Sequence, residues 1–236
     1  MEFTKVKLKN NLFYWTWKDL PFLPYAWLDK KDLKNLPKPF YLPEIHPGCT
    51  VGWKSDDKDD YTNIIKLPKS FEEIKMDSDL RKDLRRVEKK NVDLKLVWNE
   101  PNALENSKKW FLELWKENKK DFARRLELWK ERCHTISAYL NGELIAVHIG
   151  MKEKDIIYYF GCWWNRKYKG MSVPTFLLKI GIEDAIKNGM KYYDLEIGNQ
   201  PYKKQWGVIE KPTKYYAVVT KKIAKELGLK KFIELK

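Results

Sequence analysis

The sequence predicts a mixed α/β sheet domain, and three observations carry this prediction. Between residues 78 and 129, apolar residues recur at helical spacing. Asn141-Gly142, a strong hairpin signal because both residues tolerate positive φ, joins two strand-like segments. A strand–helix–strand pattern follows over residues 156–197. Helices, then a meander, then such a unit are expected to build helices packed on a mixed sheet.

The first 70 residues are expected to form a small subdomain that packs its aromatic residues against the rest of the chain rather than folding alone. They are rich in proline and aromatic residues, and few windows hold a helical or strand period for long. We therefore predict an irregular subdomain over residues 1–70, with short strands such as 63–67 and an exposed charged loop over 54–60. Residues 71–236 are predicted to form the main domain.

The elements of the main domain follow from local patterns. Leu80, Leu84 and Val87 are spaced i, i+4, i+7 and predict a helix with basic residues on its other faces. Residues 172–189 predict a long helix, with Ser172 as N-cap, Pro174 in the first turn and Gly189 at the end. The other predicted helices cover 104–115, 122–129, 202–206 and 221–227, and the predicted strands cover 93–98, 134–140, 143–150, 156–162, 191–197 and 214–219.

Composition excludes several classes of protein. A chain of 236 residues with 43% hydrophobic residues can bury a sizeable core and is not disordered. The most apolar stretch, residues 12–28, is interrupted by charges and prolines, so no membrane span or secretory leader is expected. The three cysteines, at positions 49, 133 and 162, lie too far apart for a zinc motif or a disulfide framework. We expect a cytoplasmic protein without a metal.

The net charge is +14, from 47 Lys and Arg against 33 Asp and Glu. Such a surface attracts nucleic acid, anionic lipid or a phosphorylated ligand. A generally lysine-rich composition explains the charge equally well, so the charge by itself does not identify a partner.

Two segments are candidate sites. The loop before the long helix offers backbone N–H groups and positive charge at a helix N-terminus, which suits a pyrophosphate. Its candidate binding residues are Arg166, Lys167, Lys169, Gly170, Met171 and Ser172. A solvated basic turn is the alternative.

The second segment runs from Tyr193 to Gly207, where a strand ends at Gly198. Ligands of open α/β sheets lie at the carboxyl ends of strands. Lys203 is a candidate for stabilising an oxyanion, and Tyr202 for protonating a leaving thiolate. Asp194 is either a base or a cap of the turn. Simple packing of Tyr202 and Trp206, with a solvated Lys203, is the alternative.

Residues 61–219 resemble the acetyltransferase-like domains of the GNAT superfamily, in the branch of cellulose-biosynthesis-type and Fem-like enzymes. The resemblance rests on three groups of residues: Leu80-Arg81-Lys82-Asp83-Leu84-Arg85-Arg86 before a strand, Asn141-Gly142-Glu143-Leu144-Ile145-Ala146 in the hairpin, and Ser172-Val173-Pro174 with Leu177-Leu178. Its most specific part is Tyr193-Asp194-Leu195 with Gly198, Pro201-Tyr202-Lys203 and Trp206-Gly207.

The resemblance implies a mixed sheet splayed at its centre that grips an acyl carrier. Strand 156–162 would line the pantetheine arm of acetyl-CoA or another acyl-CoA, and loop 167–172 would hold its pyrophosphate. The implied reaction transfers the acyl group to an amine acceptor. Arg85, Arg86, Gly198 and Trp206 are expected to contact substrate.

Two alternatives remain open at the level of sequence. Fem-type relatives take their acyl group from aminoacyl-tRNA, and there a lysine at the place of Lys203 stabilises transition-state charge. A decayed transferase fold could also bind RNA without catalysis, because aromatic faces interleaved with cations stack bases.

Overall fold

The structure is a computed structural model, and it describes residues 3–8, 12–17, 32–45, 49, 51–55, 61–115, 119–129, 133–198 and 200–235. The chain divides into two compact units. The larger comprises Asn63–Glu210, and the smaller comprises Met1–Thr62 together with Lys211–Lys236.

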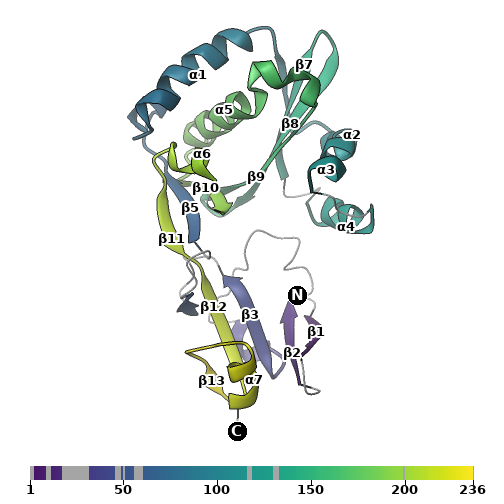
Figure 1. The fold of residues 1–236 in the computed structure, drawn as a ribbon, viewed down its shortest axis with the longest axis vertical. Coiled ribbons are helices and arrows are strands. Elements are labelled where there is room, and N and C mark those ends of the chain that lie inside the picture. Colours follow the sequence, from purple (N-terminus) through teal and green to yellow (C-terminus); the bar gives the residue numbers. More distant parts are fainter. Residues whose placement is uncertain are drawn as a thin grey trace. The chain divides into compact units, whose positions relative to one another are not determined.

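The larger unit is built on a seven-stranded mixed sheet with the strand order β11-β5-β10-β9-β8-β7-β6 (Figure 1). The pairs β6–β7, β7–β8 and β8–β9 are antiparallel, whereas β9 and β10 run parallel. Asn141 and Gly142 both have positive φ and form the turn between β7 and β8, as their sequence predicts. The strands are β5 (Tyr61–Lys66), β6 (Lys95–Trp98), β7 (Cys133–Leu140), β8 (Glu143–Glu153), β9 (Ile156–Trp164), β10 (Tyr192–Ile197) and β11 (Ile209–Pro212).

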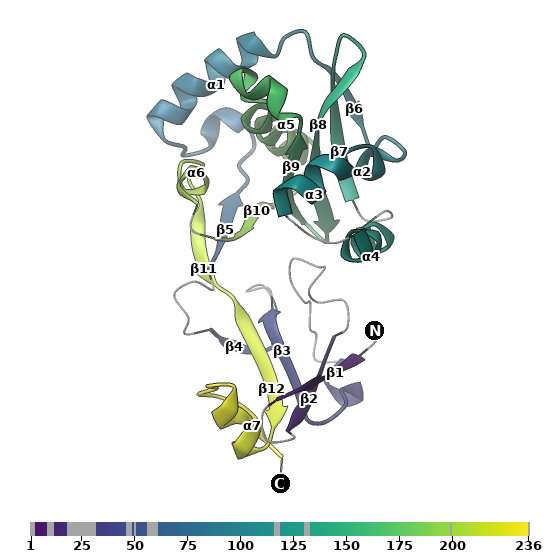
Figure 2. The same cartoon turned by 45° about the vertical axis from the view of Figure 1, so that its right-hand side comes forward.

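Helices cover both faces of this sheet (Figures 1 and 2). On one face lie α1 and α5, which bury the predicted stripe of Leu80, Leu84 and Val87. On the other lie α3 and α4, where Phe111 packs on Trp163 of β9 with ring centroids 4.5 Å apart. The helices of this unit are η4 (Phe71–Glu73), α1 (Ser78–Lys90), α2 (Ala103–Asn106), α3 (Lys108–Trp115), α4 (Lys119–Trp129), η5 (Arg166–Met171), α5 (Val173–Lys187) and α6 (Pro201–Lys204).

The single helix predicted over residues 104–115 is wrong in one respect, because the structure divides it into α2 and α3 at Ser107. The buried Ser107 hydroxyl donates to the carbonyls of Ala103, at 2.8 Å, and Leu104, at 3.1 Å. Such side-chain bonds compete with the helical backbone pattern and favour a break.

The smaller unit is also a sheet, ordered β1-β2-β3-β12-β13, with β4 paired to β12. Its central strand β12 covers two separate cores: Tyr216 and Val218 face one, and Ala217 and Val219 face the other. Its elements are β1 (Phe3–Lys7), β2 (Phe13–Trp17), η3 (Asp32–Asn35), β3 (Phe40–Ile45), β4 (Trp53–Lys54), β12 (Lys214–Val219), α7 (Lys221–Glu226) and β13 (Ile233–Glu234).

This arrangement differs from an irregular region over residues 1–70. The described N-terminal residues form paired strands of two to six residues, which are too short to show a period in sequence. Residues 211–236 group with them because β12 pairs with β3 and β4. Most of the charged loop predicted over 54–60 lies outside the described residues.

The mixed sheet flanked by helices confirms the predicted fold class. Among the described residues, no helix is both long and apolar enough to cross a membrane.

Candidate functional site

A cavity opens where β9 and β10 part. The two strands pair in only three registers, the last joining Asp194 to Tyr158, although both strands continue. Beyond that pair lies a cavity of about 610 Å³. The splayed sheet predicted from the resemblance is therefore present. The lining residues are Leu80, Tyr159, Phe160, Gly161, Cys162, Trp163, Pro174, Thr175, Leu178, Leu195, Glu196, Ile197, Gln200, Tyr202, Lys203, Gln205 and Trp206.

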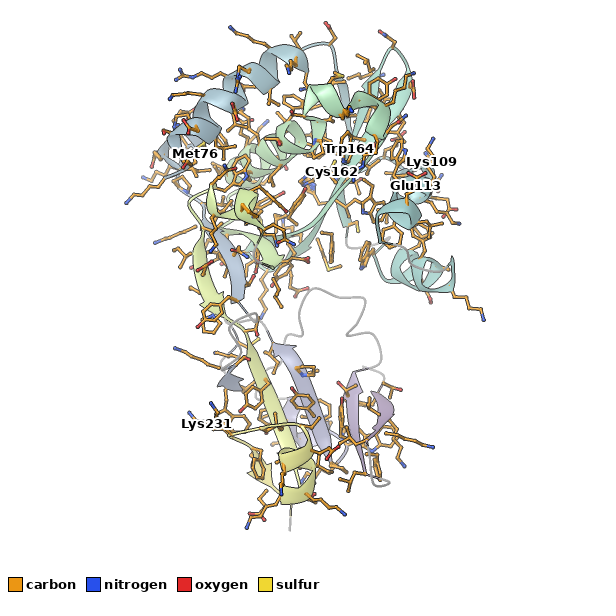
Figure 3. All side chains as sticks on the ribbon, in the orientation of Figure 1. Met76, Lys109, Glu113, Cys162, Trp164 and Lys231 are labelled. Carbon is orange, nitrogen blue, oxygen red and sulfur yellow. The ribbon has the colours of Figure 1, made fainter. Side chains whose placement is uncertain are left out.

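The wall that β9 contributes is bent by a bulge. Along the β8–β9 pair, Ile149 faces Gly161 but Gly150 faces Tyr159, so Phe160 is an extra residue. Gly161 has a φ of +134°, which a side chain would strain. The bulge changes which face each residue reaches. Tyr159 and Cys162 therefore both pack on the side of α1 and α5, and Figure 3 labels Cys162 on this strand.

The wall that β10 contributes ends in an irregular turn. Glu196 has a φ of +62°, in the left-handed region that residues other than glycine seldom adopt, and Gly198 has a φ of +125°. In a regular strand, successive carbonyls point to opposite sides. Here the carbonyls of Glu196 and Ile197 both accept from the Lys203 ammonium, at 3.2 and 2.8 Å.

The short helix α6 carries Lys203 to this place. Pro201 opens the helix, where its missing N–H costs nothing. Trp206 anchors the following turn in the core, with its ring edge-on to Phe71. Gly207, with a φ of +66°, lies so close to the Lys75 carbonyl that any side chain would collide with it. These constraints explain why Pro201 and Gly207 flank the candidate lysine.

Lys203 is 4% exposed. Burial lowers the pKa of its ammonium, and the carboxylates of Glu196 and Asp194 oppose that shift. An ammonium has three N–H groups, and the carbonyls of the β10 turn take two of them. The third has no acceptor among the described residues, so it is available to a ligand in the cavity.

Tyr202 also lines the cavity, with 41% of its surface exposed. Burial, and secondarily Glu196, raise the pKa of its phenol to about 12. Its hydroxyl is therefore a hydrogen-bond donor near neutral pH.

The other predicted residues of this segment have structural positions. Asp194 is fully buried and lies outside the cavity wall, and its Oδ1 accepts the backbone N–H of Glu196 at 2.7 Å. Of the two roles left open for Asp194, this geometry corresponds to the cap of the turn. Gly198 shapes the turn without lining the cavity, whereas Trp206 lines it.

The predicted pyrophosphate loop is folded as the 3₁₀ helix η5, and none of its residues lines the cavity. The carbonyl of Gly170 accepts from Lys90 at 3.0 Å, and that of Met171 from Asn91 at 2.8 Å. Ser172 occupies the N-cap position of α5, but its side chain makes no capping bond. Arg166 lies over the Trp164 ring at 4.4 Å, and Lys167 and Lys169 are exposed.

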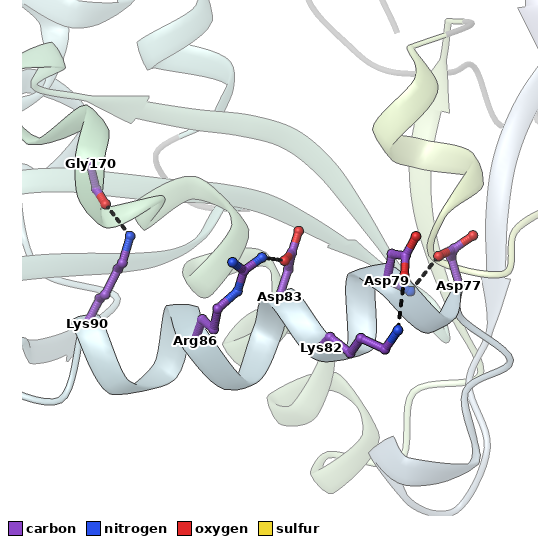
Figure 4. A network of polar contacts seen from close by, with 7 residues as sticks. All are labelled: Asp77, Asp79, Lys82, Asp83, Arg86, Lys90 and Gly170. Carbon is purple, nitrogen blue, oxygen red and sulfur yellow. Dashed lines mark hydrogen bonds and ion pairs between the residues drawn. The ribbon is translucent and has the colours of Figure 1, made fainter.

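Arg85 and Arg86 lie on the exposed surface of α1, outside the cavity wall. Figure 4 shows Arg86 paired with Asp83, and Lys90 reaching Gly170. The last turns of α1 thus present cations beside those of η5. None of these cations lines the cavity itself.

A buried histidine–tyrosine pair lies beneath α5. Nε2 of His148 is 2.8 Å from the Tyr193 hydroxyl, and both side chains are fully buried. Burial lowers the pKa of His148 to about 3. Gly181 allows the close approach, because a Cβ there would lie 2.7 Å from the Tyr193 hydroxyl. In the described parts of the chain, no group of three His, Cys, Asp or Glu side chains could hold a metal ion.

Strand 156–162 was expected to line the site, and its residues Tyr159–Cys162 do line the cavity. Sequence reasoning missed Thr175 and the bulge in β9. One signal was present, since Gly161 interrupts a strand of large residues, and a glycine inside a strand often marks a bulge. It also missed Asn63, a buried amide on β5 whose partners lie on β10 and are 133 and 135 residues away in sequence. No local pattern could have found those partners.

The splayed mixed sheet and the cavity at its opening define an acyltransferase fold of the GNAT class. The sequence profile described as "Acetyltransferase (GNAT) domain" matches residues 75–204, more than half of the chain. The chain therefore belongs to this family, and the predicted resemblance is confirmed. No curated protein matches the chain.

Solved structures share the fold at low sequence identity. FemX aligns with a TM-score of 0.58 at 13% identity, over 75% of this chain and 67% of its own. The C-terminal domain of a putative lysylphosphatidylglycerol synthetase from Agrobacterium fabrum aligns with a TM-score of 0.59 at 11% identity, over 96% and 86%. L-PGS from Bacillus licheniformis has a TM-score of 0.54 at 12% identity, over 78% and 68%. These likenesses establish the fold.

Proposed function

We propose that this chain is an N-acyltransferase that moves an acyl group from acetyl-CoA or another acyl-CoA to an amine. The acyl carbonyl would lie in the cavity between β9 and β10. The observation that carries the proposal is the Lys203 ammonium in the cavity wall, just beyond the last parallel pair of the two strands.

The chemistry needs no covalent enzyme intermediate. The amine nitrogen attacks the thioester carbonyl carbon, a C–N bond forms, and the C–S bond breaks. The proton lost by the nitrogen balances the charge of the departing thiolate. Positioning, and stabilisation of the negative charge on the carbonyl oxygen, are what the protein supplies. The third N–H of Lys203 is suited to that oxygen.

In thioester chemistry, Tyr202 is poorly suited to the role expected for it from sequence, which is to protonate the leaving thiolate. A thiol has a pKa of about 8.5, far below the pKa of about 12 of the Tyr202 phenol. Proton transfer from that phenol to a thiolate is unfavourable, so Tyr202 would donate a hydrogen bond to the departing sulfur.

The same pKa supports a second candidate function, transfer from an aminoacyl ester of tRNA. There the leaving group is a ribose oxygen, a much stronger base than a thiolate. A phenol with a pKa of about 12 is better matched to it. The lysylphosphatidylglycerol synthetase that shares this fold is likewise named for an aminoacylated product. The basic surface of α1 and η5 suits the phosphates of either donor.

Thermal unfolding with a panel of ligands tests the proposal. Acetyl-CoA, longer acyl-CoAs, free CoA and bulk tRNA would each be added at two salt concentrations. A ligand at 100 times its Kd stabilises the folded state by about 2.7 kcal/mol, which raises the Tm of a domain this size by about 5 to 10 °C.

The outcomes separate the candidates. A shift with acyl-CoA that persists in high salt supports the first function. A shift with tRNA alone that fades with salt replaces it by the second function, or by RNA binding without catalysis. No shift with any ligand contradicts both donors.

A further inference from the structure

Asn63 is a buried polar residue that does not line the cavity. It lies on β5, 2% exposed, between Thr62 and the apolar Ile64. Its Nδ2 donates to the carbonyls of Glu196 and Gly198, both at 2.9 Å. Both N–H groups of the amide therefore donate to the irregular turn at the end of β10.

Asn63 and Lys203 hold the same turn from two elements. Lys203 donates to the carbonyls of Glu196 and Ile197, and Asn63 to those of Glu196 and Gly198. Three consecutive carbonyls therefore accept four hydrogen bonds from two side chains. The Glu196 carbonyl is shared, which places the two nitrogens within about 6 Å of each other, a range in which charges influence a pKa.

The turn requires such bracing because its backbone is strained. A left-handed φ at a glutamate costs of order 1 kcal/mol or more and persists only where the surroundings impose it. Without the amide, two half-buried carbonyls lose a donor. The turn then lowers its free energy by relaxing toward a regular strand, in which the carbonyls of Glu196 and Ile197 point to opposite sides.

We infer that Asn63 is a positioning residue: through the Glu196–Gly198 turn it fixes the Lys203 ammonium in the wall of the cavity. The amide does this without adding charge, so the ammonium keeps its two carbonyl acceptors and directs its third N–H into the cavity. The inference rests on the proposed function only for the consequence to catalysis, because the geometry of the turn is independent of the donor.

The test measures Lys203 itself rather than turnover. Surface and buried amines would be acetylated by a trace of acetic anhydride over a range of pH, and the labelling at Lys203 and Lys204 quantified by mass spectrometry. Lys204 is an internal reference, since it is the next residue, is exposed, and pairs with Glu210 at 3.4 Å. The ratio of the two labels reports the accessibility and pKa of Lys203.

Two variants at position 63 are expected to move that ratio in opposite directions. In Asn63→Ala the ammonium loses fixed acceptors and becomes accessible, so Lys203 labelling rises relative to Lys204. Asn63→Asp removes the same two N–H donors, but its carboxylate offers the freed ammonium a charged acceptor and raises its pKa, so the ratio falls. Each change is expected to reach about tenfold, the effect of about one pKa unit.

Ile65→Ala is the matched control, because Ile65 is equally buried on β5 and belongs to the apolar core. It is expected to lower Tm while leaving the labelling ratio unchanged. If Asn63 only supports the fold, Asn63→Ala, Asn63→Asp and Ile65→Ala will leave the ratio of Lys203 to Lys204 labelling unchanged, or will all shift it in the same direction. Either result overturns the inference.

Measuring turnover tests separately whether the position of Lys203 matters for catalysis. With an active donor and amine, Asn63→Ala is expected to lower kcat about tenfold or more with the donor KM within about twofold. If Lys203→Met retains activity, the proposed role of Lys203 fails, whereas opposite labelling shifts would still establish the positioning of Lys203 by Asn63.

Discussion

Replacing Lys203 by methionine removes the ammonium and keeps an unbranched side chain. Two effects follow from the structure. The carbonyls of Glu196 and Ile197 lose a charged donor, although Asn63 still donates to the first of them. Hydrogen bonds to charged groups stabilise by about 1.5–3 kcal/mol. Burial of the ammonium offsets part of this, as its lowered pKa indicates. We expect a net loss of about 1–2 kcal/mol of folding free energy.

The effect on catalysis is expected to be larger. Loss of one donor to a developing oxyanion costs about 10²–10³ in kcat, or roughly 2.7–4 kcal/mol. Because the interaction forms in the transition state, KM for the acyl donor should stay within about twofold. The assay is release of free thiol from acyl-CoA in the presence of the acceptor amine.

Lys204→Met is the matched control, since Lys204 adjoins Lys203 but is exposed and does not line the cavity. It is expected to retain full turnover. A Lys203→Met protein that folds and turns over within about threefold of the parent would refute the reasoning, because one lost oxyanion donor has a far larger cost.

Three further predictions concern packing, pH and the η5 segment. Gly181→Ala, normally favourable in a helix, is expected to lower stability by about 1–3 kcal/mol in denaturant unfolding, since the new Cβ would collide with Tyr193 and His148; a gain in stability would contradict this packing. Because the pKa of His148 falls from its ordinary value near 6.5 to about 3 in the folded state, the unfolded chain binds the proton first. Its contribution to stability is therefore full above about pH 6.5 and is lost progressively as pH falls toward the folded pKa, about 2 kcal/mol by pH 5. His148→Phe should flatten that part of the stability–pH curve, and an unchanged slope would show that other groups cause it. Gly170→Val is expected to leave Tm unchanged, as a Cβ there meets nothing within 4 Å, and to weaken donor binding in titration calorimetry; unaltered affinity would remove η5 from the donor site.

Much of the larger unit was predictable because its elements carry strong local signals. The stripe of Leu80, Leu84 and Val87 and the Asn141-Gly142 turn each fix one element without reference to the rest of the chain. The N-terminal strands carry no such signal. They are short, and their sheet is completed by β12, a strand from the far end of the chain that pairs with β3 and β4, so only tertiary structure reveals it.

The site divides in the same way. Lys203 and Tyr202 were predicted from their position after a strand that ends in glycine, and both line the cavity. The loop before α5 was predicted to offer free backbone N–H groups to a pyrophosphate. The fold makes it a 3₁₀ helix whose carbonyls accept from Lys90 and Asn91, and its binding of a pyrophosphate stays a prediction. Asn63 could not be predicted, because its role depends on contacts across the sheet.

The central claim is that the acyl donor occupies the cavity between β9 and β10, and blocking that cavity tests it most directly. Thr175 lines the cavity and is only half-buried on the first turn of α5, so Thr175→Trp adds bulk there. Lys187→Trp, exposed at the other end of α5, is the control. The measurement is the Tm shift produced by acetyl-CoA. We predict that the shift persists in the parent and in Lys187→Trp and is abolished in Thr175→Trp. An equal shift in all three proteins would contradict the claim.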